Sequence, residues 1–271
     1  MKKPFIYLLT AGLAFSMITN TDTANANALE SKASVTFTTP VPTLVDPVNP
    51  REPSEEYPGN PAEDGDVNEE ASLLSLDYVS NLNFGEVQLD MSNLSDSAEN
   101  LNIPVRTQSP FIQVSDQRYS GSGWNVQAEL SNFNTVTSDS DPEFTSEPSL
   151  KGSSIIFNVP EVTSTGDFIW NENNNAIDPV QVFAGNDSSV EIVSTQERAE
   201  NEPLNAGAHG LGTWVITWLG SLEPDVPNEK INLNIPASTA IAGEHEATIS
   251  WTLTDGPGID TAEVPVDGID E

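Results

Sequence analysis

Two short segments of the sequence concentrate bulky aromatic and aliphatic side chains at alternating positions. The first holds Trp214, Ile216 and Trp218, and the second holds Trp251 and Leu253. On a β-strand, residues two apart point to the same side, so each segment presents one apolar face. Such a face either fills the interior of a sheet protein or forms an exposed platform that stacks on sugar rings or on an apolar partner. These five are the candidate binding residues, and the sequence leaves both interpretations open.

The ionisable residues give little support to catalytic chemistry. The chain has 42 acidic residues, so suitable carboxylate pairs arise by chance, and none is singled out as the pair that a glycosidase needs. His209 and His245 accompany no nucleophile motif, and we expect both in loops or at the surface. We therefore predict a protein that is not an enzyme and that uses no cofactor.

The sequence does not predict a metal site. With no cysteine and two histidines, few ligands remain for a transition metal. Asp139, Asp141 and Glu143 resemble part of a calcium loop, but the glycine and the distal glutamate of an EF-hand are missing. A solvated acidic loop is the favoured interpretation. If divalent cations bind at all, these residues and Asp187 are the places to look.

The formal net charge of −33 restricts the partners of the chain. Nucleic acids and anionic lipids bind basic patches, so both are disfavoured. Any anionic polymer would be repelled at long range, and its binding would depend on short-range contacts or on bridging cations.

The N-terminus has the pattern of a secretory signal peptide. Lys2 and Lys3 precede a mostly apolar run over residues 4–18, and two overlapping Ala-Asn-Ala sites follow at residues 24–28. The apolar run is shorter than the ~20 residues that a membrane-spanning helix needs. We predict a signal peptide over residues 1–28 and export of the rest, without membrane insertion.

Two different segments are expected between residues 29 and 71. Residues 33–39 alternate apolar and polar side chains around Val35 and Phe37, which predicts a short strand. Residues 40–70 hold seven prolines and nine acidic residues, a composition typical of an extended, solvated linker.

Residues 72–271 are predicted to form one all-β domain. Runs with a period of two, such as residues 124–130 and 247–253, are separated by clusters of Asn, Asp, Ser, Gly and Pro. This pattern favours an antiparallel β-sandwich, immunoglobulin-like or related. The last residues are polar, so we expect no sortase-type wall signal and hence no covalent attachment.

Five segments, which follow each other in the order that the family has, resemble the WxL domains of Gram-positive surface proteins. They are residues 76–85, 111–124, 150–152, 212–216 and 251–253. Trp251-Thr252-Leu253 matches the distal W-x-L segment. The proximal segment departs from it, because Ile216 stands where leucine is usual. Ser80 replaces a common proline, and His245 replaces a common tyrosine.

The resemblance implies a secreted cell-surface protein that is held non-covalently on peptidoglycan. It also implies partner surface proteins in a common complex. An alternative within the same resemblance is an adhesin that binds host extracellular matrix proteins and reaches the wall through a partner protein.

Overall fold

The computed structural model describes residues 31–38, 40–90, 99–136, 148–172, 177–223 and 226–257. The chain divides into two units, residues 1–38 and 39–271. Residues 31–38 of the first unit form no strand, and all of them are exposed. The strand predicted at residues 33–39 is therefore wrong over its described part, since an extended segment needs a neighbouring strand for its backbone hydrogen bonds.

The described residues of the second unit form four sheets whose strands pair antiparallel. The first sheet has the order β1 (Gly65–Val67), β2 (Leu74–Ser80), β4 (Phe111–Asp116), β12 (Gly212–Thr217) and β9 (Glu161–Ser164). The second has the order β10 (Val180–Phe183), β8 (Ser154–Phe157), β13 (Asn228–Ile235) and β3 (Leu101–Val105). The third has the order β11 (Val190–Ser194), β5 (Trp124–Leu130) and β15 (Ile249–Asp255). The fourth has the order β14 (His245–Glu246), β6 (Phe133–Thr135) and β7 (Pro148–Ser149). Two single-turn helices complete the elements, α1 (Pro61–Asp64) and α2 (Ala206–His209).

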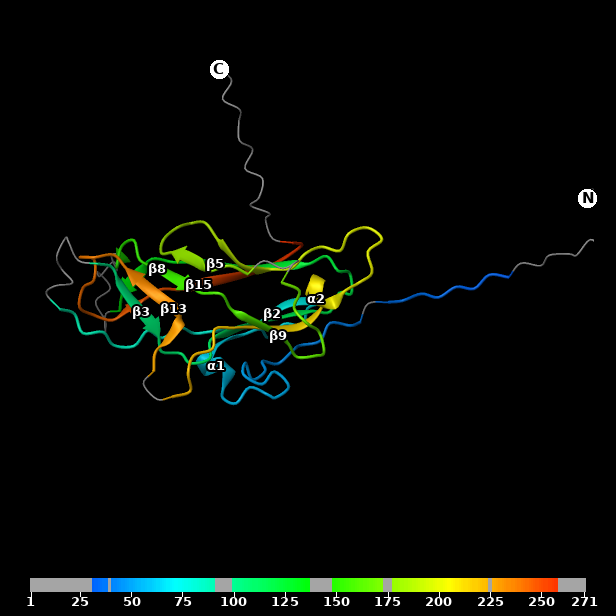
Figure 1. Cartoon of the computed structure of the whole chain (residues 1–271), viewed down its shortest axis with the longest axis horizontal. Helices are drawn as coiled ribbons and strands as arrows, with labels where there is room; N and C mark the ends of the chain where they lie inside the picture. The colour runs from blue at the N-terminus through cyan, green and yellow to red at the C-terminus, as the bar shows by residue number, and fades with distance from the viewer. Residues whose placement is uncertain are drawn as a thin grey trace, which may run out of the picture. The chain divides into compact units, whose positions relative to one another are not determined.

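These sheets form the predicted β-sandwich. Figure 1 shows β5 and β15 in one layer and β2 and β9 in the other. One core cluster lies between the layers, and its buried side chains come from both, among them Val126, Ala128, Val114 and Ile216. The alternation along each strand thus predicted the layer architecture correctly.

The central strand of the first sheet is buried on both faces, because all six residues of β4 are buried. One face carries Ile112 and Val114 into the main core. The other face carries Phe111 into a second cluster with Tyr78 and Val215. The outer face of the sheet therefore needs a cover.

Residues 46–67, here called the arm, provide this cover. Val48, Tyr57 and Val67 pack against the second cluster, and β1, at the end of the arm, extends the sheet by pairing with β2. The Tyr57 ring lies 6.0 Å from that of Phe111. The solvated linker predicted over residues 40–70 is wrong for this part, because the apolar outer face of the sheet recruits its few apolar side chains.

Two side chains hold the arm in place. Gln113, which is 0% exposed, accepts a hydrogen bond from the Val48 N–H at 2.9 Å and donates to the Asp46 carbonyl at 3.1 Å. Its amide thus binds the arm much as a neighbouring strand would. The Arg51 guanidinium donates to the carbonyls of Gln108 and Gly220 at 2.9 and 2.7 Å. The arm is a docked part of the second unit despite its proline-rich, acidic composition.

We predict that Gln113→Ala loosens the arm. The substitution leaves the Val48 N–H and the Asp46 carbonyl without their partner, which costs about 1–3 kcal/mol of unfolding free energy. Urea unfolding measures this loss, and hydrogen exchange at the Val48 amide should accelerate. Gln117→Ala is the matched control, because the hydrogen bonds that the Gln117 side chain forms with Thr43 are exposed. Unchanged exchange at Val48 would contradict the role of Gln113.

Candidate functional site

The two predicted tryptophan segments lie on strands, but in different sheets. Trp214 and Ile216 belong to β12 of the first sheet, and Trp218 follows directly after that strand. Trp251 and Leu253 belong to β15 of the third sheet. The two segments therefore face each other across the sandwich and do not share one surface.

Three of the five predicted binding residues are buried. Trp214 and Ile216 are 0% exposed, and Trp218 is 2% exposed. Trp251 and Leu253 are only half-buried and pack against the main core from its edge. A side chain with no exposed surface cannot touch an insoluble polymer, so the structure assigns the first three residues to the interior.

Aromatic contacts connect the two segments through a single phenylalanine. Phe157 of β8 lies 5.3 Å from Trp218 and 5.8 Å from Trp251, measured between ring centroids. Both pairs are tilted or edge-on, the geometry that aromatic rings prefer. At this point the rings of β8 and β15 and of the residue that follows β12 pack together.

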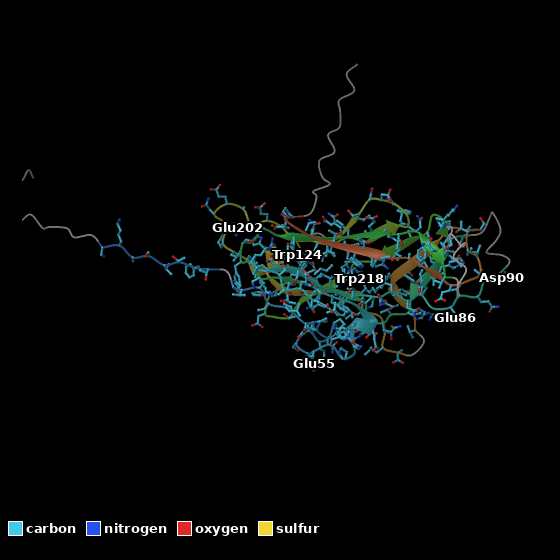
Figure 2. All side chains as sticks on the ribbon, turned by 180° about the vertical axis from the view of Figure 1, so that it is seen from behind. Glu55, Glu86, Asp90, Trp124, Glu202 and Trp218 are labelled. Carbon is cyan, nitrogen blue, oxygen red and sulfur yellow. The ribbon has the colours of Figure 1, made fainter. Side chains whose placement is uncertain are left out.

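A second aromatic cluster contains the other three tryptophans, Trp124, Trp170 and Trp214. Trp170 lies 5.2 Å from Trp214 and 6.2 Å from Trp124. Figure 2 places Trp124 toward the end of the sandwich where Glu202 lies, and Trp218 farther along the body. The five tryptophans thus make two clusters, one at that end and one nearer the middle.

The connection from α2 to β12 accepts hydrogen bonds from two of the buried indoles. Trp124 donates to the Gly210 carbonyl at 2.9 Å, and Trp214 donates to the Leu211 carbonyl at 3.0 Å. Gly210 has a left-handed φ of 67°, and a Cβ there would lie 2.3 Å from the Trp124 indole nitrogen. This position requires glycine because both the backbone conformation and the close approach exclude a side chain.

A surface hollow lies beside the cluster at the end of the sandwich. Its volume is about 440 Å³, and it is lined by Asp167, Phe168, Ile169, Trp170, Asn171, Asn205 and Gly207. Phe168 is 47% exposed and Ile169 is 84% exposed. The Trp170 indole N–H is buried, and none of the residues that the structure describes accepts a hydrogen bond from it. The hollow is open to solvent and combines the exposed apolar surface of Phe168 and Ile169 with amide and carboxylate groups.

Sequence reasoning did not select this hollow. The signal was present as three consecutive bulky residues, Phe168, Ile169 and Trp170, directly after a Gly-Asp pair that is typical of a turn. Three such residues in a row do not alternate, so a search for strand faces passes over them.

The first sheet also contains a buried carboxyl group. Asp77 is 1% exposed and accepts hydrogen bonds from the Ser75 and Ser115 hydroxyls at 2.5 and 2.6 Å and from the Gln113 amide at 3.1 Å. Burial raises the pKa of Asp77 above its ordinary value of 3.8, and these three hydrogen bonds partly oppose that shift. Gln113 bonds both to this carboxyl group and to the arm. The carboxyl group therefore has a structural role in the sheet.

The two histidines differ from each other in their surroundings. His209 is 1% exposed, and its Nδ1 lies 3.1 Å from the Gln196 carbonyl, so the prediction of a loop or surface position is wrong for this residue. His245 is half-buried, with Nδ1 at 2.9 Å from the Ser149 hydroxyl. Both rings are used in packing between loops and short elements.

The structure contains no group of three potential metal ligands among the residues that it describes. Asp139, Asp141 and Glu143 lie outside the described residues, and Asp187 is exposed. Within the described part of the chain, no helix is long and apolar enough to cross a membrane.

Comparison with known proteins gives one match. A family model described as "WxL domain surface cell wall-binding" matches residues 24–257. No curated protein and no solved structure matches the chain. The matched region includes the arm, both tryptophan segments and the hollow.

We predict that Trp218→Ala and Trp251→Ala differ in their cost. Removal of the buried Trp218 leaves a large cavity and lowers the unfolding free energy by about 3–5 kcal/mol, whereas removal of the half-buried Trp251 costs about 1–3 kcal/mol. Urea unfolding followed by circular dichroism measures both values. Equal, small losses in the two variants would contradict the assignment of Trp218 to the core.

The raised pKa of Asp77 predicts a pH dependence of stability. Between pH 3.8 and the raised pKa, the folded state keeps a proton that the unfolded state releases, so the unfolding free energy falls as the pH rises through this window. The wild type should therefore lose stability relative to Asp77→Asn as the pH rises above 3.8. Asp187→Asn is the control for the loss of one exposed carboxylate. A constant difference between wild type and Asp77→Asn would refute the prediction.

Proposed function

This chain belongs to the WxL family of surface domains that bind the cell wall, and from that premise we propose that its β-sandwich holds the protein non-covalently on peptidoglycan. The family match, which extends over residues 24–257, is the observation that carries the proposal. The protein is located at the cell wall, on the cell surface.

We place the wall contact at the hollow beside Trp170. The sugars of peptidoglycan present apolar ring faces, hydroxyl groups and acetamido carbonyls. Phe168 and Ile169 offer exposed apolar surface for the ring faces, and the side-chain carboxylate of Asp167 can accept hydrogen bonds from hydroxyl groups.

Charge limits how such binding can operate. A net charge of −33 produces long-range repulsion from an anionic wall, and Figure 2 shows Glu55, Glu86 and Glu202 at the periphery of the body. Attraction must therefore come from direct contacts. Because salt screens the repulsion between exposed charges, added salt should maintain or strengthen binding.

The five binding residues predicted from the sequence do not form the wall contact in this proposal. Trp214, Ile216 and Trp218 build the core that supports the hollow, since the Trp214 ring lies against Trp170. Trp251 and Leu253 lie on an edge strand, away from the residues that line the hollow. We assign these two residues to contacts with other protein chains, in keeping with a multi-protein surface complex.

Sedimentation with purified sacculi tests the wall contact. Residues 29–271 should sediment with sacculi, and Phe168→Ala with Ile169→Ala should weaken binding about tenfold, a loss of about 1.4 kcal/mol. Leu222→Ala is the matched control, because Leu222 is 74% exposed and does not line the hollow. Circular dichroism must show that both variants stay folded.

The outcomes separate the alternatives. Wild-type protein that stays in solution would overturn direct wall binding, and retention on host matrix proteins instead of sacculi would favour the adhesin alternative. If the wild type binds and the double variant binds equally well, only the placement of the wall contact at the hollow is overturned.

A further inference from the structure

The described part of the N-terminal unit has the sequence of a strand but pairs with no other described strand. Val35 and Phe37 alternate with Ser34, Thr36 and Thr38, yet Val35 is 74% exposed and Phe37 is 89% exposed. Residues 31–38 form no secondary structure. An extended segment with two exposed apolar side chains on one face is suited to pair with the edge of a sheet, because pairing satisfies its backbone and buries that face.

Most sheet edges among the described residues are protected against such pairing. The edge strands β1, β9 and β10 have three or four residues, and those of the fourth sheet have two. The edge strand β3 contains Pro104, which cannot donate a backbone hydrogen bond. The edge strand β11 has an irregular register between Glu191 and Val193. Short strands, prolines and bulges are the usual means by which proteins block their edges.

The edge strand β15 lacks all of these protections. It has seven residues, Ile249–Asp255, with no proline, and its register with β5 is regular throughout. Within the described residues, β15 pairs only with β5. It is thus the longest edge strand of the structure and the one most open to an added strand.

The hydrogen-bond pattern shows which residues of β15 face the free edge. The Gly256 N–H bonds to the Gly123 carbonyl, and the Ser131 N–H bonds to the Thr248 carbonyl. In an antiparallel ladder, pairs that exchange hydrogen bonds alternate with pairs that do not. The backbone groups of Ser250, Thr252 and Thr254 therefore point to β5, and those of Trp251 and Leu253 point outward. The tryptophan and the leucine of the W-x-L segment therefore expose their backbone hydrogen-bonding groups along the free edge.

The inner face of β15 is incompletely covered as well. Ile249, Trp251 and Leu253 pack against the core but stay half-buried. An added strand beside β15 would bring its own inward side chains next to those of Ile249, Trp251 and Leu253. Val35 and Phe37 have the spacing of two residues that this geometry needs.

Charge also favours residues 31–38 as the added strand. Lys32 is the only charged residue among them, in a chain of net charge −33. The free edge ends at Asp255, which is exposed and shares Arg118 with Asp116. A segment with one positive charge and no carboxylate can approach such a body without like-charge repulsion.

We propose that residues 33–38 of one copy of this chain add as a strand to the free edge of β15 in a second copy. Val35 and Phe37 then cover Trp251 and Leu253, and Thr36 lies beside Thr252 on the outer face. Donor segment and acceptor edge are different parts of the chain, so the contact is heterologous and each copy can donate and accept once. The product is a ring or a linear assembly of copies. The proposal does not depend on the wall ligand.

Cysteine cross-linking tests the contact directly, because the chain has no cysteine of its own. Thr36→Cys in one preparation of residues 29–271 is mixed with Ser250→Cys or Thr252→Cys in another. Under mild oxidation, disulfide-linked dimers of donor and acceptor should form, since paired strands bring Cβ atoms within disulfide distance. Thr163→Cys, on the edge strand β9, is the matched acceptor control, and it should give little cross-linking.

Variants of the donor segment test the apolar contact. Val35→Asp with Phe37→Asp should reduce the cross-linked product by about tenfold or more, because it removes the burial of two large side chains. Val41→Asp, at an exposed valine outside the segment, should have little effect. Both changes lie at exposed positions, and circular dichroism should show an unchanged fold.

Four results would overturn the proposal. The first three are no dimer between residue 36 and β15, equal yields with Thr163→Cys, and yields that Val35→Asp with Phe37→Asp does not lower. A fourth is a monomeric cross-link in the double variant Thr36→Cys/Thr252→Cys at high dilution, which would show that the segment pairs within its own chain. Sedimentation velocity distinguishes monomers from assemblies in each case.

Discussion

The burial of β4 on both faces is the constraint on which the rest of the structure depends. A strand that is buried on both sides requires a layer on each side, and the chain provides two different ones. The second layer of the sandwich covers Ile112 and Val114. The arm covers the opposite face and is held there by Gln113 and Arg51. A chain without disulfides therefore obtains a two-sided interior from a segment that is rich in proline and acid.

The tryptophans serve this interior more than they serve the surface. Trp124 and Trp214 donate to backbone carbonyls of one connection, and Trp218 donates to the Asn158 carbonyl at 2.6 Å. Each of these buried indoles thus has an acceptor for its N–H, as a large polar-tipped side chain in a core requires. Trp170 has no acceptor among the described residues, and Trp251 lies at an edge. These two residues lie beside the two surfaces at which we propose contacts with other molecules.

Those two places suit different kinds of partner. The hollow beside Trp170 is concave and mixes apolar with polar groups, which suits sugar rings. The edge of β15 is linear and presents backbone hydrogen-bonding groups, which suits another strand. The two contacts that we propose use different parts of the domain, so attachment to the wall and assembly with other chains are compatible. In a body with strong negative charge, both contacts depend on short-range complementarity.

The sequence by itself determined the class of the fold and the location of its principal strands. The alternation over residues 124–130, 214–219 and 247–253 depends on local geometry, because side chains two apart share a face in any strand. The order of the resembling segments likewise identified the family. Neither conclusion requires knowledge of what lies beside a strand.

Exposure was decided only by the tertiary structure, because it depends on segments that are distant in the sequence. Trp214 and Trp251 have similar local sequences, but β12 is flanked by two strands, whereas β15 is flanked by β5 alone in the described structure. The docking of the arm depends on Gln113, about 65 residues away, and its own composition favours solvent. A local pattern specifies which side chains share a face, and only the assembled sheets specify what covers that face.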